Sequence, residues 1–142
     1  MALLPVTPPK TTLRVAIAGG PCCGKSTLAE RMRGRVDAPE VQHTDDLVDV
    51  LQWSEASAEV ATWFTADGPF IVEGVAVSRA LRKWLAANPT GKPCDVLYHL
   101  TNPFLARTPG QKTMAKGEDT VWDEIAPELR ARGVELRFTV EA

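Results

Sequence analysis

One short stretch near the amino end of the chain combines residue types that bind phosphate. Residues 19–26 read GGPCCGKS and match the pattern G-x-x-x-x-G-K-[ST]. Glycines allow backbone conformations that a Cβ would block, so successive N–H groups can turn inward and cradle a phosphate. The lysine supplies charge for the β- and γ-phosphates, and the serine hydroxyl is a ligand for Mg²⁺. The residues predicted to form this phosphate loop are Gly19, Gly20, Pro21, Cys22, Cys23, Gly24, Lys25 and Ser26.

The elements that must position the loop follow from the hydrophobic pattern. Residues 13–18 (LRVAIA) form a short apolar run, which suits a parallel strand buried on both faces. Residues 25–33 place Leu28 and Met32 on one face of a helix directly after the loop. Further strands are expected at residues 41–44, 70–72, 95–100 and 134–140, and further helices in two pieces within 46–66, at 75–87 and at 121–132.

Strands that alternate with helices predict an α/β layered fold with a mainly parallel sheet. Ser54 and Ser57 are expected to interrupt the second helical region. Residues 101–118 are polar and contain several prolines and glycines, which predicts a mobile connection. Thr120 and Asp123 resemble a capping box that would begin the last helix.

Length and composition favour one folded domain. The chain has 142 residues, of which 44% are hydrophobic and 24% are charged, with a net charge of −2. We expect a mobile segment over residues 1–12 and a single domain over 13–142. No apolar run approaches the roughly 18 residues that span a membrane, and no signal peptide is recognisable, so a cytoplasmic protein is expected. Three cysteines and two histidines do not suggest a disulfide framework or a Cys/His zinc site.

The run VAIAGGPCCGKSTLAERM resembles the phosphate loop of the P-loop kinase superfamily. That superfamily includes nucleoside, nucleotide and small-metabolite kinases and polynucleotide 5′-kinases. The resemblance extends over most of residues 13–140. It implies a P-loop NTPase-type three-layer fold with a five-stranded parallel sheet of order 2-3-1-4-5. It also implies ATP and Mg²⁺ as cofactors, with Lys25 catalytic, Ser26 on the metal and Thr27 near the α-phosphate.

The second segment that carries the resemblance is HTDDL at residues 43–47. Related kinases often have an acidic residue here, and a carboxylate at the end of a parallel strand faces the ligand crevice. Asp45 matches the family's catalytic base best and Asp46 second, and both are candidates to contact the acceptor. In the simpler interpretation Asp46 caps the next helix and Asp45 is only solvated.

The third segment is FIVEG at residues 70–74, which resembles a strand end of uridine-kinase-like proteins. The resemblance implies that Glu73 holds a water on Mg²⁺ or contacts the acceptor. In the alternative, Glu73 is an exposed residue of a turn. The Walker-B aspartate usual in P-loop proteins is absent, so the second contact to the metal stays open.

The fourth segment lies within residues 102–118, where the family has a short lid that closes on ATP. Arg107 is the best candidate to act on the transferring group, with Lys112 and Lys116 in support. Relatives often have two or three arginines here, and a solvated basic loop is the alternative. Arg79 follows Glu73 on a helix and either binds an acidic acceptor or faces solvent.

The aromatic side chains between Asp45 and Glu73 leave two interpretations open. One of Trp53, Trp63 and Phe64 stacks on an acceptor base, or all three belong to the core.

The two adjacent cysteines lie in the phosphate loop itself. A thiol at a helix N-terminus tends toward a lowered pKa, so oxidation of Cys22 or Cys23 would place bulk or charge where phosphate binds. The alternative is that both positions merely tolerate cysteine.

Three functions remain open from the sequence. The first is a kinase that transfers the γ-phosphoryl group of ATP to a hydroxyl of a nucleoside, nucleotide or metabolite. The second is a kinase that acts on a nucleic acid, at a 5′-end or a hydroxymethylated base, although Val48 and Asp49 stand where polynucleotide kinases tend to carry an arginine. The third is a non-catalytic ATP-binding switch. The base-specifying N-K-x-D of GTPases is absent. The oligomeric state is not readable from the sequence.

Overall fold

The protein has a five-stranded, all-parallel sheet with the strand order β2-β3-β1-β4-β5. The strands are β1 (Arg14–Gly19), β2 (Val41–His43), β3 (Phe70–Glu73), β4 (Val96–Leu100) and β5 (Glu135–Arg137). The predicted α/β class and strand order are therefore confirmed. The computed structural model describes residues 13–36, 40–48, 51–66, 68–101 and 106–138; the expectations for residues 1–12, 102–105 and 139–140 lie outside these.

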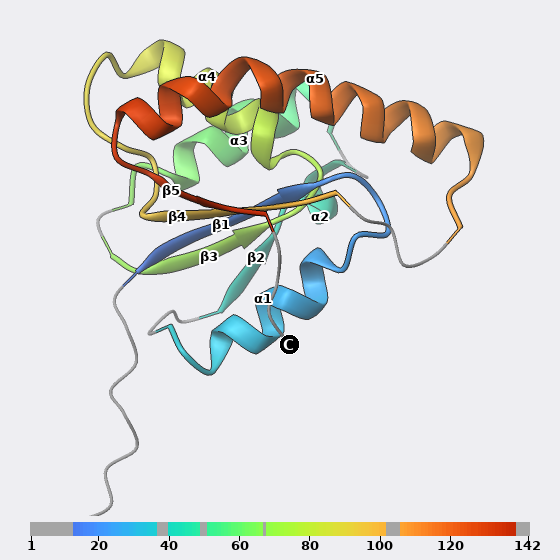
Figure 1. Cartoon of the computed structure of the whole chain (residues 1–142), viewed down its shortest axis with the longest axis horizontal. Coiled ribbons are helices and arrows are strands. Elements are labelled where there is room, and N and C mark those ends of the chain that lie inside the picture. The colour runs from blue at the N-terminus through green and yellow to red at the C-terminus, as the bar shows by residue number, and fades with distance from the viewer. Residues whose placement is uncertain (1–12, 37–39, 49–50, 67, 102–105, 139–142) are drawn as a thin grey trace, which may run out of the picture.

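Helices cover both faces of this sheet. Figure 1 shows α3, α4 and α5 on one face and α1 on the other. The helices are α1 (Lys25–Arg33), α2 (Asp45–Val48), α3 (Trp53–Trp63), α4 (Val77–Ala87) and α5 (Pro109–Ala131). Helix α1 has the predicted bounds. Although α5 has 23 residues, neither it nor any other described helix is long and apolar enough to cross a membrane.

The central strand β1 divides the core into two clusters. Successive side chains of a strand point to opposite faces. Ala16 and Ala18 pack with residues of α3, α4 and α5, whereas Val15 and Ile17 pack with residues of α1. Because both faces of β1 are covered, its sequence is a continuous apolar run rather than an alternating one. This buried strand delivers the phosphate loop to the carboxyl edge of the sheet.

The predicted break between α2 and α3 was misplaced. Ser54 and Ser57 lie inside α3, which begins at Trp53. The Ser57 hydroxyl donates to the Ser54 carbonyl oxygen at 3.1 Å, so its polar group is satisfied within the helix. The described non-helical residues before α3 lie earlier, at positions 51 and 52.

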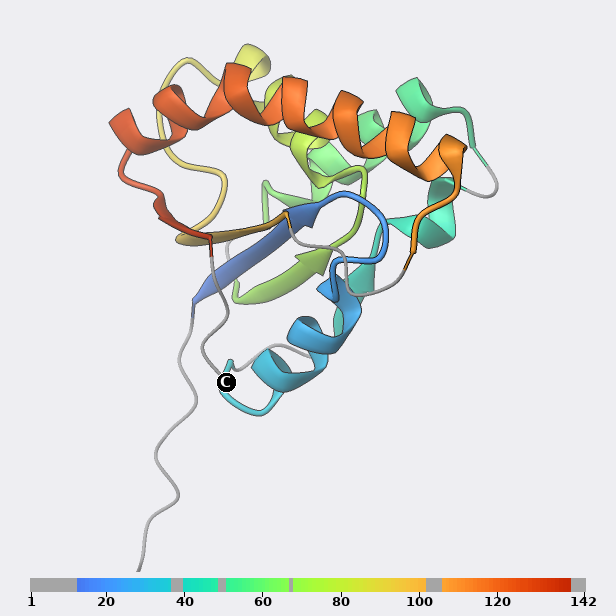
Figure 2. The ribbon, with the colours of Figure 1, turned by 45° about the vertical axis from the view of Figure 1, so that its right-hand side comes forward.

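The predicted start of the last helix was wrong by about three turns. Helix α5 begins at Pro109, where an irregular connection was expected. Thr108 and Gln111 form a reciprocal capping box, and Pro109 occupies the first helical position. Thr120, the predicted cap, instead donates to the Lys116 carbonyl oxygen inside the helix at 3.0 Å. Figure 2 shows that the first turns of α5 extend over the loop that follows β1.

Candidate functional site

A cleft of about 470 Å³ opens at the carboxyl edge of the sheet. Such crevices beyond the strand ends are the usual ligand sites of open α/β sheets. The phosphate loop forms its floor, the ends of β2 and β3 form one side, and the start of α5 forms another. The lining residues are Pro21, Cys22, Cys23, Gly24, Lys25, Ser26, Thr27, Asp45, Glu73, Val75, Gln111 and Met114.

The backbone of the phosphate loop adopts conformations that restrict its sequence. Gly19 has φ 148°, and a Cβ there would lie 2.3 Å from the Leu100 carbonyl oxygen. Gly24 has φ 83° immediately before α1, and Cys22 has φ 64°, which is uncommon for a residue with a side chain. Left-handed residues of this kind build the concave N–H surfaces that bind anions. The loop therefore has backbone features of an anion site.

Helix α5 packs directly against this loop. A Cβ on Gly20 would lie 2.8 Å from the Ala115 Cβ and 2.9 Å from Arg107 Nη2. Gly20 is therefore needed to let α5 approach, and neither Gly19 nor Gly20 is among the residues that line the cleft.

Lys25 is buried beneath the loop and is 6% exposed. Its Nζ donates to the Gly20 carbonyl oxygen at 2.6 Å. Lys25 is also the first residue of α1. The N-terminus of a helix favours an anion, and the lysine charge would attract the same anion. The Gly20 carbonyl oxygen, which belongs to the loop, thus holds the Lys25 ammonium group at the loop.

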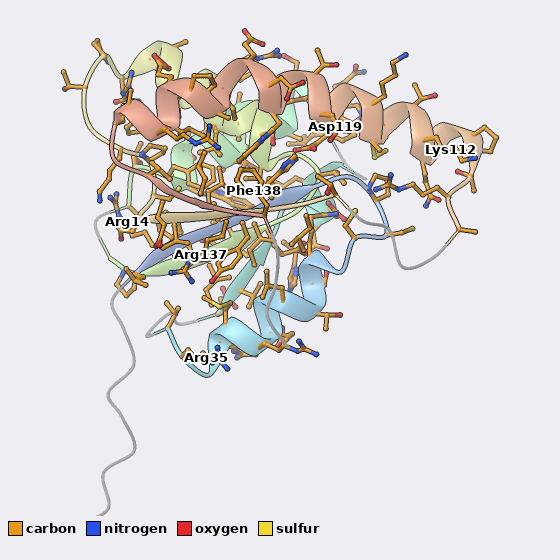
Figure 3. The ribbon with its side chains drawn as sticks, viewed as in Figure 1. Arg14, Arg35, Lys112, Asp119, Arg137 and Phe138 are labelled. Atoms are coloured by element: carbon orange, nitrogen blue, oxygen red, sulfur yellow. The ribbon has the colours of Figure 1, made fainter. Side chains whose placement is uncertain are left out.

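Arg107 lies against the loop rather than in a separate lid. Its Nε donates to the Pro21 carbonyl oxygen at 2.8 Å, and its Nη2 contacts Cys23 Sγ at 2.9 Å. Arg107 does not line the cleft. Lys112 and Lys116 are exposed on α5, and Figure 3 shows Lys112 at the outer end of that helix.

The two loop cysteines differ in environment. Cys23 is buried, and burial raises the pKa of its thiol although Arg107 and Lys25 act in the opposite direction. The lowered pKa expected from the helix N-terminus is therefore wrong for Cys23, because desolvation of the thiolate outweighs the nearby positive charges. Cys22 is half-buried and lines the cleft, with its Sγ 4.0 Å from Gln111 Oε1.

Glu73 is a buried carboxylate at the edge of the cleft. It is 1% exposed, so the interpretation as an exposed turn residue is wrong. Oε1 accepts from the Ser26 hydroxyl at 3.2 Å and lies 2.5 Å from His43 Nδ1. Oε2 is buried without a hydrogen-bond partner among the described residues. A carboxylate oxygen without a partner is costly to bury, and a bound cation would offset that cost.

Sequence reasoning missed His43, which contacts this carboxylate. His43 and Glu73 are partners in the parallel register of β2 and β3, so the sheet brings together two residues thirty positions apart. The hydrogen bond to Glu73 raises the pKa of His43, although partial burial of the ring acts in the opposite direction. The only signal available in the sequence is that each residue stands near the end of an expected strand.

Asp45 lies at the cleft and Asp46 does not line it. Asp45 is the first residue of α2, and its Oδ1 accepts from the Val75 backbone N–H at 3.2 Å. Gly74 allows this approach, because a Cβ there would lie 1.8 Å from Thr44 Oγ1. The two strand ends are therefore fixed to each other, and Asp45 is held beside Glu73.

Arg79 is half-buried and is not among the cleft-lining residues. Its guanidinium stacks over Trp53 with 4.8 Å from Cζ to the ring centroid. Burial lowers the pKa of Arg79, and its Nη1 has no partner among the described residues. Trp63 and Phe64 belong to the core around α3 and α4, as the second interpretation of the aromatic residues expected, whereas Trp53 packs against Arg79.

A second buried carboxylate, Glu118, lies on α5 and is 0% exposed. Its Oε1 accepts from the Ser78 hydroxyl at 2.5 Å, and its Oε2 is 3.0 Å from His99 Nε2. Burial opposes ionisation, but the hydrogen bonds from His99 and Ser78 prevail and lower the pKa of Glu118. Asp119 lies 3.9 Å from the same imidazole nitrogen. His99, Glu118 and Asp119 have a spacing that would suit a metal ion, yet both Glu118 oxygens are already hydrogen bonded.

Searches against models of known protein families and against curated proteins found no match for this chain. The cleft is therefore the feature of this chain that bears on its function. The cleft combines a glycine-shaped loop, a buried lysine, a serine hydroxyl and two carboxylates. Together these groups can bind phosphate, hold a divalent cation and accept a proton.

Proposed function

We propose that the protein is an ATP-dependent kinase that transfers a phosphoryl group to a hydroxyl of a small molecule such as a nucleoside, nucleotide or metabolite. In this proposal the domain is of the P-loop NTPase type. The observation that carries it is that Lys25, Ser26, Asp45 and Glu73, predicted separately from three segments, all line one cleft. The strand before the loop and the helix after it supply the setting that the phosphate-loop pattern requires.

The residues of the cleft fit ATP and Mg²⁺. The left-handed backbone at Cys22 and Gly24 is suited to an anion. The unpartnered Oε2 of Glu73 and the Ser26 hydroxyl are hard oxygen donors of the kind that Mg²⁺ prefers. When bound, Mg²⁺ would neutralise charge that develops on the phosphate oxygens. Lys25 would add its charge to the same phosphates once it leaves the Gly20 carbonyl oxygen.

Asp45 is the proposed base. The Val75 N–H donates to the Asp45 carboxylate and holds it at the cleft, where an acceptor hydroxyl could approach. As the hydroxyl oxygen bonds to the γ-phosphorus and the bond from that phosphorus to the bridging oxygen breaks, Asp45 would take the hydroxyl proton. Arg107 would assist only after it releases the Pro21 carbonyl oxygen.

The test is transfer of γ-labelled phosphate from ATP with Mg²⁺. The acceptor panel holds nucleosides, nucleotides, common metabolites, 5′-hydroxyl oligonucleotides and hydroxymethylated DNA. We expect label on a small molecule, and loss of that label in Lys25→Ala. Lys92→Ala is the matched control, because Lys92 pairs with Asp95 and does not line the cleft.

Label on an oligonucleotide or on hydroxymethylated DNA would replace the small-molecule proposal by a nucleic-acid kinase. ATP binding without transfer to any acceptor would contradict Asp45 as a base. Full activity of Lys25→Ala would overturn the site itself.

A further inference from the structure

We propose that His43 is a positioning residue that fixes the Glu73 carboxylate so that Oε2 is left free to hold a divalent cation together with Ser26. This inference rests on the proposed kinase function. It assigns a role to a histidine that opens the HTDDL segment but had no role in the sequence analysis, where only Asp45 and Asp46 were candidates. The role is to orient a ligand of the metal and not to contact substrate.

The sheet register places His43 next to Glu73. The two residues are Cα partners at the ends of parallel strands β2 and β3. The Glu73 side chain is 2% exposed, whereas that of His43 is 35% exposed. His43 Nδ1 lies 2.5 Å from Oε1, and we assign the tautomer in which the Nδ1–H donates to that oxygen, which also accepts from Ser26. Short contacts of this type are strong and directional.

Ser26 completes the argument for orientation. Its hydroxyl donates to Oε1 at 3.2 Å, while its oxygen keeps lone pairs that can ligate a cation. Oε1 therefore has two donors, and Oε2 has no partner among the described residues. A glutamate carboxylate rotates about its last bond, and two donors on one oxygen stop that rotation. The arrangement leaves one serine oxygen and one carboxylate oxygen as hard ligands of the kind that Mg²⁺ uses.

Loss of the His43 hydrogen bond should weaken the cation site without removing any ligand. Partners that orient metal ligands typically change metal affinity by about 10- to 100-fold when they are mutated. The measurable quantity is the coupling between Mg²⁺ and ATP, expressed as the ratio of the ATP Kd in EDTA to the ATP Kd in saturating Mg²⁺. This ratio isolates the metal from the rest of the nucleotide site.

The experiment measures that ratio with a fluorescent ATP analogue for wild type, His43→Ala, His43→Asn and Glu73→Gln. Gln42→Ala, at the neighbouring position of β2, is the matched control. We expect His43→Ala to lower the ratio about 10- to 100-fold with the Kd in EDTA unchanged. We expect His43→Asn to keep most of the ratio, because its amide N–H can replace the Nδ1–H donor. Glu73→Gln should bring the ratio close to one.

Three results would overturn this inference and leave the kinase proposal standing. The first is that His43→Ala keeps the wild-type ratio while Glu73→Gln loses it. The second is an equal fall of the ratio in His43→Ala and His43→Asn, and the third is a loss of ATP affinity in EDTA in His43→Ala; either of these would indicate a general structural role. If the wild-type protein does not bind the analogue in either condition, the kinase proposal itself fails.

Discussion

Glu73 and Glu118 are two fully buried carboxylates with similar partners and different surroundings. Each lies next to one serine hydroxyl and one histidine nitrogen. At Glu118 the serine and the histidine bind different oxygens, so both oxygens are satisfied. At Glu73 both partners bind the same oxygen, and the other oxygen has no partner among the described residues.

This difference separates two reasons for burying a charge. Glu118 joins α4, through Ser78, and β4, through His99, to its own helix α5. Its satisfied network is suited to fixing the packing of these elements. Glu73 lines the cleft and keeps an oxygen available. The number of open hydrogen-bonding positions, rather than burial alone, distinguishes the carboxylate proposed to hold a metal from the one whose hydrogen bonds are all made.

The largest expected effect is on catalysis. Glu73→Gln removes the negative charge of a proposed metal ligand. We therefore expect the rate of phosphoryl transfer to fall by about 10²-fold or more. The unfolding midpoint should not fall, because the substitution also removes a buried, half-satisfied charge. Label-transfer rates and thermal unfolding measure the two effects. A clear loss of stability with normal activity would place Glu73 in the structural class.

The second expected effect is on stability. Glu118→Gln replaces one acceptor by an amide donor that faces Ser78 or His99, so the free energy of unfolding should fall by about 1–3 kcal/mol. Urea unfolding measures this loss. The transfer rate per folded molecule should stay at the wild-type level. Loss of activity without loss of stability would show that the two carboxylates are not distinct in role.

The third expectation concerns how the free energy of unfolding changes at low pH. Because the folded pKa of Glu118 lies below its ordinary value of 4.5, its ionised form adds stability above that value. The stability is lost as pH falls from about 4.5 through the folded pKa. In urea unfolding between pH 6 and about pH 3, Glu118→Gln should therefore flatten the decline seen in wild type. An identical decline in both proteins would contradict the assigned direction.

The smallest expected effect is at Asp119. Burial and the neighbouring Glu118 raise the pKa of this carboxyl, so its ionised form at neutral pH opposes folding. Because the Asp119 side chain is 58% exposed, solvent screens most of this effect, and Asp119→Asn should raise the free energy of unfolding by less than about 0.5 kcal/mol. Urea unfolding at pH 7 and at low pH provides the test, since the gain should vanish where Asp119 is protonated. A loss at pH 7 would mean that attraction to His99 dominates.

The elements that carry local signals were predictable from the sequence. The phosphate-loop pattern and the apolar run before it predicted β1, the loop and α1 (Lys25–Arg33) with little error. The start of α5 was missed because prolines and glycines in a polar stretch favour an irregular connection. Thr108 and Gln111 at capping-box spacing, with proline between them, were the signal that could have found it.

The partners of Glu73 were not predictable, because no local pattern encodes a parallel register. His43 reaches Glu73 only through the pairing of β2 with β3, and a lone histidine near a strand end has many other uses. The same holds for Glu118, whose partners come from α4 and β4. Contacts between distant segments decide which polar residues are free, and these contacts arise from packing.

If the protein binds a nucleotide as proposed, the resting contacts of the phosphate loop have a consequence for its affinity. Lys25 Nζ and Arg107 Nε both donate to carbonyl oxygens of the loop. Those oxygens are an internal competitor for the cations that a phosphate needs. The observed Kd for the nucleotide then equals the intrinsic Kd divided by the fraction of molecules in which these hydrogen bonds are broken. Substitutions that destabilise the resting state would tighten nucleotide binding without adding any contact to the nucleotide.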